Sequence, residues 1–182
     1  RQVFPCYFGS ALRREGVEAL LEGVRRYTRE REYPEEFGAR VYKISRDSAG
    51  NRLTHLKVTG GVLRVKMPVG NENSAAAGEE PWVEKVDVLR VYGGAGFRAA
   101  DQVPAGGICA VTGLSRTFAG QGLGFEKENL SAVLAPVLTY RLVLPEGADA
   151  VKVLGQMRKL EEEEPQLHVV WSESSQEIHV QV

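Results

Sequence analysis

The stretch GNRLTHLKVTGGVLRVKM, residues 50–67, decides the fold class, because it contains two short alternating segments separated by a turn. Apolar and polar residues alternate along both segments, and Gly60 and Gly61 lie between them. In the second segment Arg64 and Lys66 share one face, and the apolar residues next to them share the opposite face. The stretch therefore predicts half-buried β-strands with a basic outer face.

The same pattern continues on both sides, from Tyr33 to about Leu144, with turn residues about every 8 to 12 positions. This spacing is typical of an all-β barrel or sandwich, and we favour the barrel. The segment from Gly70 to Pro81 has no periodicity and predicts a long surface loop, beyond which the strands resume. The candidate strands are Arg40–Ser45, Leu53–Thr59, Val62–Met67, Glu84–Val91, Ile108–Thr112 and Ala132–Leu134.

The first 31 residues predict one strand followed by one helix. Val3 to Phe8 is a short apolar run, Gly9 and Ser10 form a turn, and the apolar residues after them recur at helical spacing until about Arg31. A lone strand and helix cannot bury an apolar stripe between them, so a further layer is required.

The last segment predicts the order strand, helix, strand, strand. Val137–Leu144 alternates, Asp149 is placed to cap a helix that stops at Pro165, and two alternating segments, Leu167–Trp171 and Glu177–Val182, follow. This order is the first part of a ferredoxin-like β-α-β-β-α-β unit. Because both ends look incomplete and the chain does not begin with methionine, we expect it to be cut from a longer protein.

Composition excludes several classes of protein. The 182 residues are 43% hydrophobic and 26% charged, with a net charge of −1, as in an ordinary globular protein of one or two domains. No apolar run approaches the roughly 20 residues of a membrane helix, so we expect a cytoplasmic protein with no membrane partner. Two distant cysteines, Cys6 and Cys109, predict reduced thiols. We also expect a monomer.

The sequence contains no catalytic or metal-binding motif. GxxxxGK[ST], HExxH, CxxC and GxSxG are absent, so we expect no catalytic residue and no metal site. The three histidines are far apart, and the acidic run Glu161–Glu164 at the end of the predicted helix is expected to be a solvated face.

The positive charge is concentrated in one region. Between Arg40 and Lys66 the chain has seven basic residues and one acid, Asp47. Outward basic side chains can neutralise phosphates, or they can keep strands soluble and protect sheet edges, and both interpretations stay open. Nothing in the sequence indicates readout of DNA bases, and no DNA partner is expected.

Three motifs carry a family resemblance. Residues 8–12, Phe-Gly-Ser-Ala-Leu, resemble the last guanine-recognition element of the translational GTPases. Residues 50–64 together with 105–120 resemble the β-barrel second domain of those factors. Residues 140–182 are similar to the third domain of elongation factor G and of the ribosomal protection proteins that confer tetracycline resistance. The short connection after the first motif is closer to the ribosomal protection branch.

The resemblance implies a fold class and three parts. The class is mainly β with α+β, in which a translation-factor-type barrel is flanked by other elements. Residues 1–33 would be the C-terminal strand and helix of a GTPase domain, 34–135 the barrel, and 136–182 part of a ferredoxin-like third domain. The segment 70–81 would be an insertion in the barrel. The chain departs from the family at Leu12, where Lys or Phe is frequent, and at Glu164, where Asp is frequent.

The resemblance also implies a function. The chain would be a fragment of a ribosome-dependent GTPase whose third domain relays the nucleotide state. The backbone amides of Ser10, Ala11 and Leu12 would donate to the guanine carbonyl oxygen. The barrel would dock on small-subunit ribosomal RNA through four basic side chains: Arg52, Lys57, Arg64 and Lys66.

The parent protein would bind GTP or GDP with Mg²⁺. The phosphate loop, the switch segments and the Asn-Lys-x-Asp element are not in this sequence, so we expect the fragment to hold no cofactor and to hydrolyse no GTP. The alternative is a standalone RNA-binding barrel adaptor without GTPase activity. A small-ligand barrel is disfavoured, because Phe97, Phe118 and Phe125 are scattered in the sequence.

Overall fold

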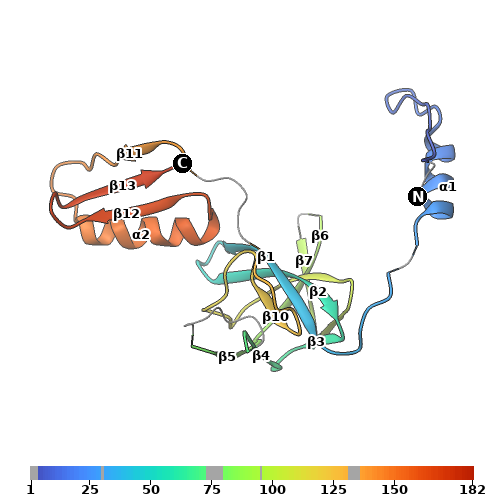
Figure 1. The fold of residues 1–182 in the computed structure, drawn as a ribbon, viewed down its shortest axis with the longest axis horizontal. Helices are drawn as coiled ribbons and strands as arrows, with labels where there is room; N and C mark the ends of the chain where they lie inside the picture. Colours follow the sequence, from blue (N-terminus) through green and yellow to red (C-terminus); the bar gives the residue numbers. More distant parts are fainter. Residues whose placement is uncertain (1–3, 30, 73–79, 95, 131–135) are drawn as a thin grey trace. The chain divides into compact units, whose positions relative to one another are not determined.

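The structure is a computed structural model that describes residues 4–29, 31–72, 80–94, 96–130 and 136–182. The chain divides into two compact units, residues 1–32 and 33–182. Strands dominate the described residues, which include two helices (Figure 1). The predicted mainly β, α+β class is confirmed. Neither described helix is long and apolar enough to cross a lipid bilayer.

The first unit contains helix α1 (Val17–Tyr27), which ends before the predicted Arg31. The apolar stripe of α1 is half exposed: Leu20 by 47% and Val24 by 50%. The predicted strand Val3–Phe8 is wrong for the part that the structure describes, since residues 4–8 are not in a strand and Phe8 is 94% exposed. A strand requires a neighbour with which to exchange backbone hydrogen bonds, and no described segment pairs with this one.

The second unit is built on a six-stranded antiparallel sheet. Residues 38–60 form its longest hairpin, whose two strands pair from Arg46 with Arg52 down to Gly38 with Gly60. In the order in which they lie side by side, the strands are β10 (Gly122–Gly124), β1 (Gly38–Arg46), β2 (Arg52–Gly60), β9 (Ile108–Val111), β6 (Leu89–Gly93) and β7 (Gly96–Ala100).

Two small two-stranded sheets complete the barrel-like part: β3 (Val62–Arg64) with β8 (Gln102–Pro104), and β4 (Pro68–Gly70) with β5 (Val83–Lys85). The predicted strand Val62–Met67 is interrupted because Lys66 has a φ of 65°, a left-handed conformation that ends a strand. Strands β7 and β10 are the two edges of the main sheet, and they do not pair with each other. The barrel is therefore open among the described residues.

One hydrophobic core joins the main sheet to both two-stranded sheets. From Thr54 on, buried and half-buried positions alternate along β2, as the sequence predicts, whereas the bulge between Val41 and Lys43 interrupts this pattern in β1. Each fully buried aliphatic side chain contributes about 1.5–3 kcal/mol. Cys109 belongs to this core, and both cysteines are free thiols. Other core members are Val41, Ile44, Leu56, Val58, Leu63, Val69, Val86, Leu89, Val103, Val111 and Leu123.

The C-terminal part has the predicted order of strand, helix, strand and strand. These elements are β11 (Thr139–Arg141), α2 (Ala150–Glu163), β12 (His168–Ser172) and β13 (Glu177–Gln181). The sheet order is β11-β13-β12, and α2 packs on one face of the sheet (Figure 1). Asp149 caps α2 by accepting hydrogen bonds from the amides of residues 151 and 152, as the sequence predicts.

Two sequence predictions involve residues that the structure does not describe. The predicted strand Ala132–Leu134 lies outside the described residues, and so does most of the predicted loop from Gly70 to Pro81. At the described ends of that loop, the side-chain oxygen of Asn71 accepts a hydrogen bond from the backbone amide of Trp82 at 2.9 Å. This bond ties the two ends together.

Candidate functional site

The motif at residues 8–12 forms a tight loop beside a small hollow. The amide of Ser10 donates to the carbonyl of Glu15 at 3.0 Å, and the amide of Glu15 donates back at 3.1 Å. Ser10 and Ala11 line a cavity of about 240 Å³, whereas Leu12 is not a lining residue and is 95% exposed. The structure thus places two of the three predicted guanine contacts at one hollow.

Glycine makes this loop possible. A Cβ added to Gly9 would lie 2.5 Å from the carbonyl oxygen of Glu15, so any larger residue must move the backbone. Because the Ser10 amide already donates to Glu15, the amides of Ala11 and Leu12 are the donors left for a ligand, and neither has an acceptor in the part of the chain that the structure describes.

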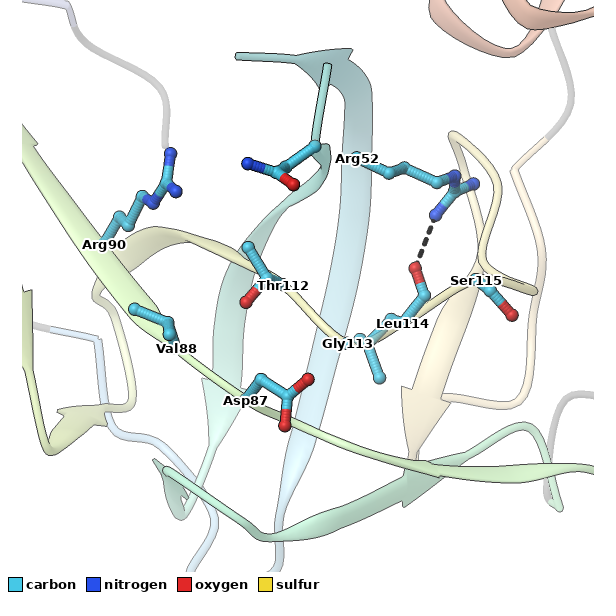
Figure 2. A pocket seen from close by; sticks show the side chains of 9 residues that line it. Arg52, Asp87, Val88, Arg90, Thr112, Gly113, Leu114 and Ser115 are labelled. Carbon is cyan, nitrogen blue, oxygen red and sulfur yellow. Dashed lines mark hydrogen bonds between the residues drawn. The ribbon is translucent and has the colours of Figure 1, made fainter. Parts of the chain in front are cut away.

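Arg52, a predicted RNA contact, has several partners within the fold, and its predicted role in RNA binding stays a prediction. Its guanidinium Nη1 donates to the carbonyl of Leu114 at 2.8 Å, as Figure 2 shows, and to Oγ1 of Thr117 at 2.9 Å. Its Nε lies 3.1 Å from a carboxylate oxygen of Glu162, and its side chain is only 17% exposed. Arg52 therefore cross-links the fold, because most of its donors already have protein acceptors.

The other three predicted RNA contacts remain at or near the surface, on different elements. Lys57 is half-buried on β2, and Arg64 is exposed on β3. Lys66 lies after the end of β3 and pairs with Asp87 at 2.8 Å. The alternation that placed Arg64 and Lys66 on one strand face is broken at Lys66.

The cavity in Figure 2, of about 580 Å³, lies between the start of β2, the start of β6 and the end of β9. Arg52 and Arg90 lie on two sides of its opening. Arg90 already binds Asp47, because both terminal nitrogens lie 3.1 Å from the same carboxylate oxygen. Asp87 is the only carboxylate among the lining residues, and it pairs with Lys66. The lining therefore provides no acid–base pair for catalysis.

The acidic run at the end of α2 is only partly the solvated face that the sequence predicts: Glu164 is exposed, whereas Glu162 and Glu163 pair with the main sheet. Arg46 pairs with Glu162 at 2.8 Å and with Glu163 at 2.9 Å, and Glu162 also pairs with Arg52. Burial alone would raise the pKa of Glu162, but hydrogen bonds from both arginines lower it below the ordinary value. These four side chains form an ionic cluster that joins the main sheet to α2.

Sequence reasoning missed a row of four rings on the outer face of the main sheet. Tyr42 and His55 have ring centroids 6.0 Å apart, His55 and Tyr92 are also 6.0 Å apart, and Tyr92 and Phe97 are 5.7 Å apart. We call these four residues the aromatic row. Each comes from a different strand, so only the pairing of the strands brings them together.

The described residues do not meet the requirements of a metal-ion site. No group of three or more His, Cys, Asp or Glu side chains among them is placed to hold an ion.

No protein-family model matches the chain. It is 27% identical to elongation factor G of Amoebophilus asiaticus over 198 residues, a match that covers 95% of this chain and 27% of that protein. It is 33% identical to elongation factor 2 of Metallosphaera sedula over 132 residues, a match that covers 67% of this chain and 17% of that protein. The chain is similar to part of elongation factor G and to part of elongation factor 2.

The fold agrees with a solved structure as well. A crystal structure of a protein from Thermus thermophilus matches 91% of this chain with a TM-score of 0.63, at 20% sequence identity, and the match covers 25% of that protein. The chain spans about a quarter or less of the length of the two curated relatives.

Proposed function

We propose that the chain is a segment of a translation elongation factor that works on the ribosome and hydrolyses GTP in its complete form. The observation that carries this proposal is the match to elongation factor G along 95% of the chain. The ribosomal protection role that the short N-terminal connection favoured gains no support from these relatives, since both are elongation factors. The proposal therefore does not include tetracycline resistance.

Each part receives a role in this proposal. Residues 1–33 are the end of the GTPase domain and contact guanine through the amides of Ala11 and Leu12, while GTP or GDP and Mg²⁺ are held by the complete protein in the cytoplasm. The barrel-like part, residues 34–135, docks as a monomer on small-subunit ribosomal RNA. Residues 136–182 relay the nucleotide state. The exposed Arg64 and the half-buried Lys57 are the phosphate contacts least committed to other residues.

The test is co-sedimentation of the chain with purified small ribosomal subunits. We expect binding at low salt that is lost as salt rises, because phosphate contacts release counterions. The double variant Lys57→Glu, Arg64→Glu should lose binding at every salt concentration. Lys85→Glu, an exposed strand lysine on β5, is the matched control and should bind like the unaltered chain.

Two results would contradict the proposal. If the unaltered chain does not sediment with the subunits at low salt, the proposed docking on the ribosome is wrong. Equal loss of binding in the double variant and in the Lys85→Glu control would show that the effect is one of net charge and not of this surface.

A further inference from the structure

The aromatic row crosses the outer face of the main sheet and is open to solvent. Three of its four rings are about half exposed: Tyr42 by 51%, Tyr92 by 43% and Phe97 by 53%. Exposed rings that lie next to one another on one sheet face are a feature of interaction surfaces, because each leaves apolar area in water.

Local backbone features put these rings together. A bulge in β1 between Val41 and Lys43 places both Tyr42 and Lys43 in exposed positions. On the far side of His55, the facing residue of β9 is Ala110, which is fully buried. Its small side chain leaves room for the ring of His55 to approach Tyr92 over β9.

Polar contacts hold two of the rings in place. Oγ of Ser45 lies 2.7 Å from Nε2 of His55. The guanidinium of Arg90 lies 4.6 Å from the centroid of Phe97 and is itself held by Asp47. Rings that are ordered before binding lose less conformational entropy when a ligand stacks on them.

The basic side chains of the main sheet differ in whether they have acidic partners: Arg40, Arg46, Arg52 and Arg90 pair with acids outside the strands, whereas Lys43 and Lys57 form no ion pair with a described residue. The six strands of the main sheet contain seven Lys and Arg residues and no Asp or Glu. Two of these lysines flank His55: Lys43 is its partner on β1, and Lys57 follows two positions later on β2. Burial and the charge of Lys43 lower the pKa of His55, which disfavours the protonated form of its imidazole.

We propose that this outer face binds unpaired RNA, whose bases stack on Tyr42, Tyr92 and Phe97 while Lys43 and Lys57 neutralise phosphates. Rings combined with basic side chains suit single-stranded nucleic acid, since every base has an apolar face next to an anionic backbone. A protein partner would have to present acids to these lysines and also cover the rings. The choice of RNA over DNA rests on the proposed function.

The test measures binding of the 182-residue chain to a fluorescein-labelled oligouridine of about ten nucleotides by fluorescence anisotropy. The double variant Tyr92→Ala, Phe97→Ala should weaken binding about tenfold or more, since stacked bases are lost. Tyr92→Phe keeps the ring and should keep the affinity. Tyr140→Ala removes an exposed tyrosine from another sheet and is the matched control.

Charge and strandedness provide independent tests. Lys43→Glu should weaken binding and Lys85→Glu should not, because only the first lysine lies beside the aromatic row. A duplex RNA of the same length should bind more weakly than the single strand, because its bases are already stacked on one another.

Several results would overturn this inference. The unaltered chain would fail to bind oligouridine, or the double variant and Tyr140→Ala would bind it with equal affinity. A third such result is that the duplex RNA binds more tightly than the single strand. Loss of ribosome binding by the double variant with unchanged oligouridine binding would show that the rings contact protein. Co-sedimentation with ribosomal subunits tests the proposed function separately when it is read with the single variant Arg64→Glu, because Arg64 lies on β3 and outside the main sheet, whereas Lys57 belongs to both proposals.

Discussion

Arg52 illustrates how one residue can hold several elements together. Its guanidinium reaches the carbonyl of Leu114, the hydroxyl of Thr117 and the carboxylate of Glu162, from a site where the side chain is 17% exposed. Hydrogen bonds that involve a charged group contribute about 1.5–3 kcal/mol each, and removal of one partner leaves the others unpaired. We therefore expect Arg52 to contribute to stability.

Substitution of Arg52 tests this role. We expect Arg52→Ala to lower the free energy of unfolding by about 2–4 kcal/mol, measured by urea denaturation. Arg52→Lys should recover only part of the loss, because an ammonium cannot reproduce the planar fork of a guanidinium. Lys57→Ala is the control and should change the free energy by less than about 0.5 kcal/mol. Similar losses at both positions would contradict the assignment.

The turn at Ser10 makes a prediction about nucleotide binding by the complete protein. Ser10→Pro removes the amide that donates to Glu15, so the loop should open and the affinity for GDP should fall at least tenfold. Leu12→Ala should leave the affinity unchanged, because the proposed contact uses the backbone amide and the side chain is 95% exposed. Isothermal titration with GDP measures both. A larger effect of Leu12→Ala than of Ser10→Pro would assign recognition to the side chain.

At the scale of elements, the end of α2 is joined to β1 and β2 by the ionic cluster of two arginines and two glutamates. The pKa of Glu162 is lowered from 4.5, so its contribution to stability is present above that pH and is lost as the pH falls through the lowered pKa. The attachment of α2 should therefore weaken on acidification below about 4.5.

The pH dependence of unfolding checks this expectation. Between about pH 3 and pH 6, the urea midpoint of the unaltered chain should rise with pH, and Glu162→Gln should reduce that rise. Glu173→Gln replaces an exposed glutamate outside the cluster and should leave the slope unchanged. An unchanged slope in Glu162→Gln would mean that the cluster contributes nothing to stability in this range.

The elements differ in how well the sequence predicts them. The alternation of apolar and polar residues predicted the bounds of β1 and β2 to within one or two residues, because one face of each strand is more buried than the other. Strands β7, β8 and β10 were missed, since they are short and contain Gly, Ala and Gln, which favour strands weakly. The strand predicted at Val3–Phe8 failed because apolar character alone does not supply a partner strand.

At the scale of the whole molecule, the sequence predicted the order of the parts better than the candidate surfaces. The β-α-β-β order and the barrel-like core follow from local patterns. The aromatic row does not, because four strand pairings are needed to bring Tyr42 and Phe97, its two ends, onto one sheet. Local sequence patterns do not predict ion pairs such as Arg46 with Glu162 either, because the two residues are 116 positions apart in the sequence. A surface whose residues are brought together by the pairing of strands can be recognised only once the fold is known.

The pairing of β10 with β1 has a kinetic consequence. Arg40 on β1 binds Glu126 across 86 positions of sequence, whereas β1 and β2 are joined by a short turn. Closing a long loop costs more entropy than closing a hairpin, so the β1–β2 hairpin should form early in folding and the Arg40 contact late. Arg40→Ala should therefore accelerate unfolding and leave the refolding rate nearly unchanged in stopped-flow experiments, whereas slower refolding would place β10 in the folding nucleus.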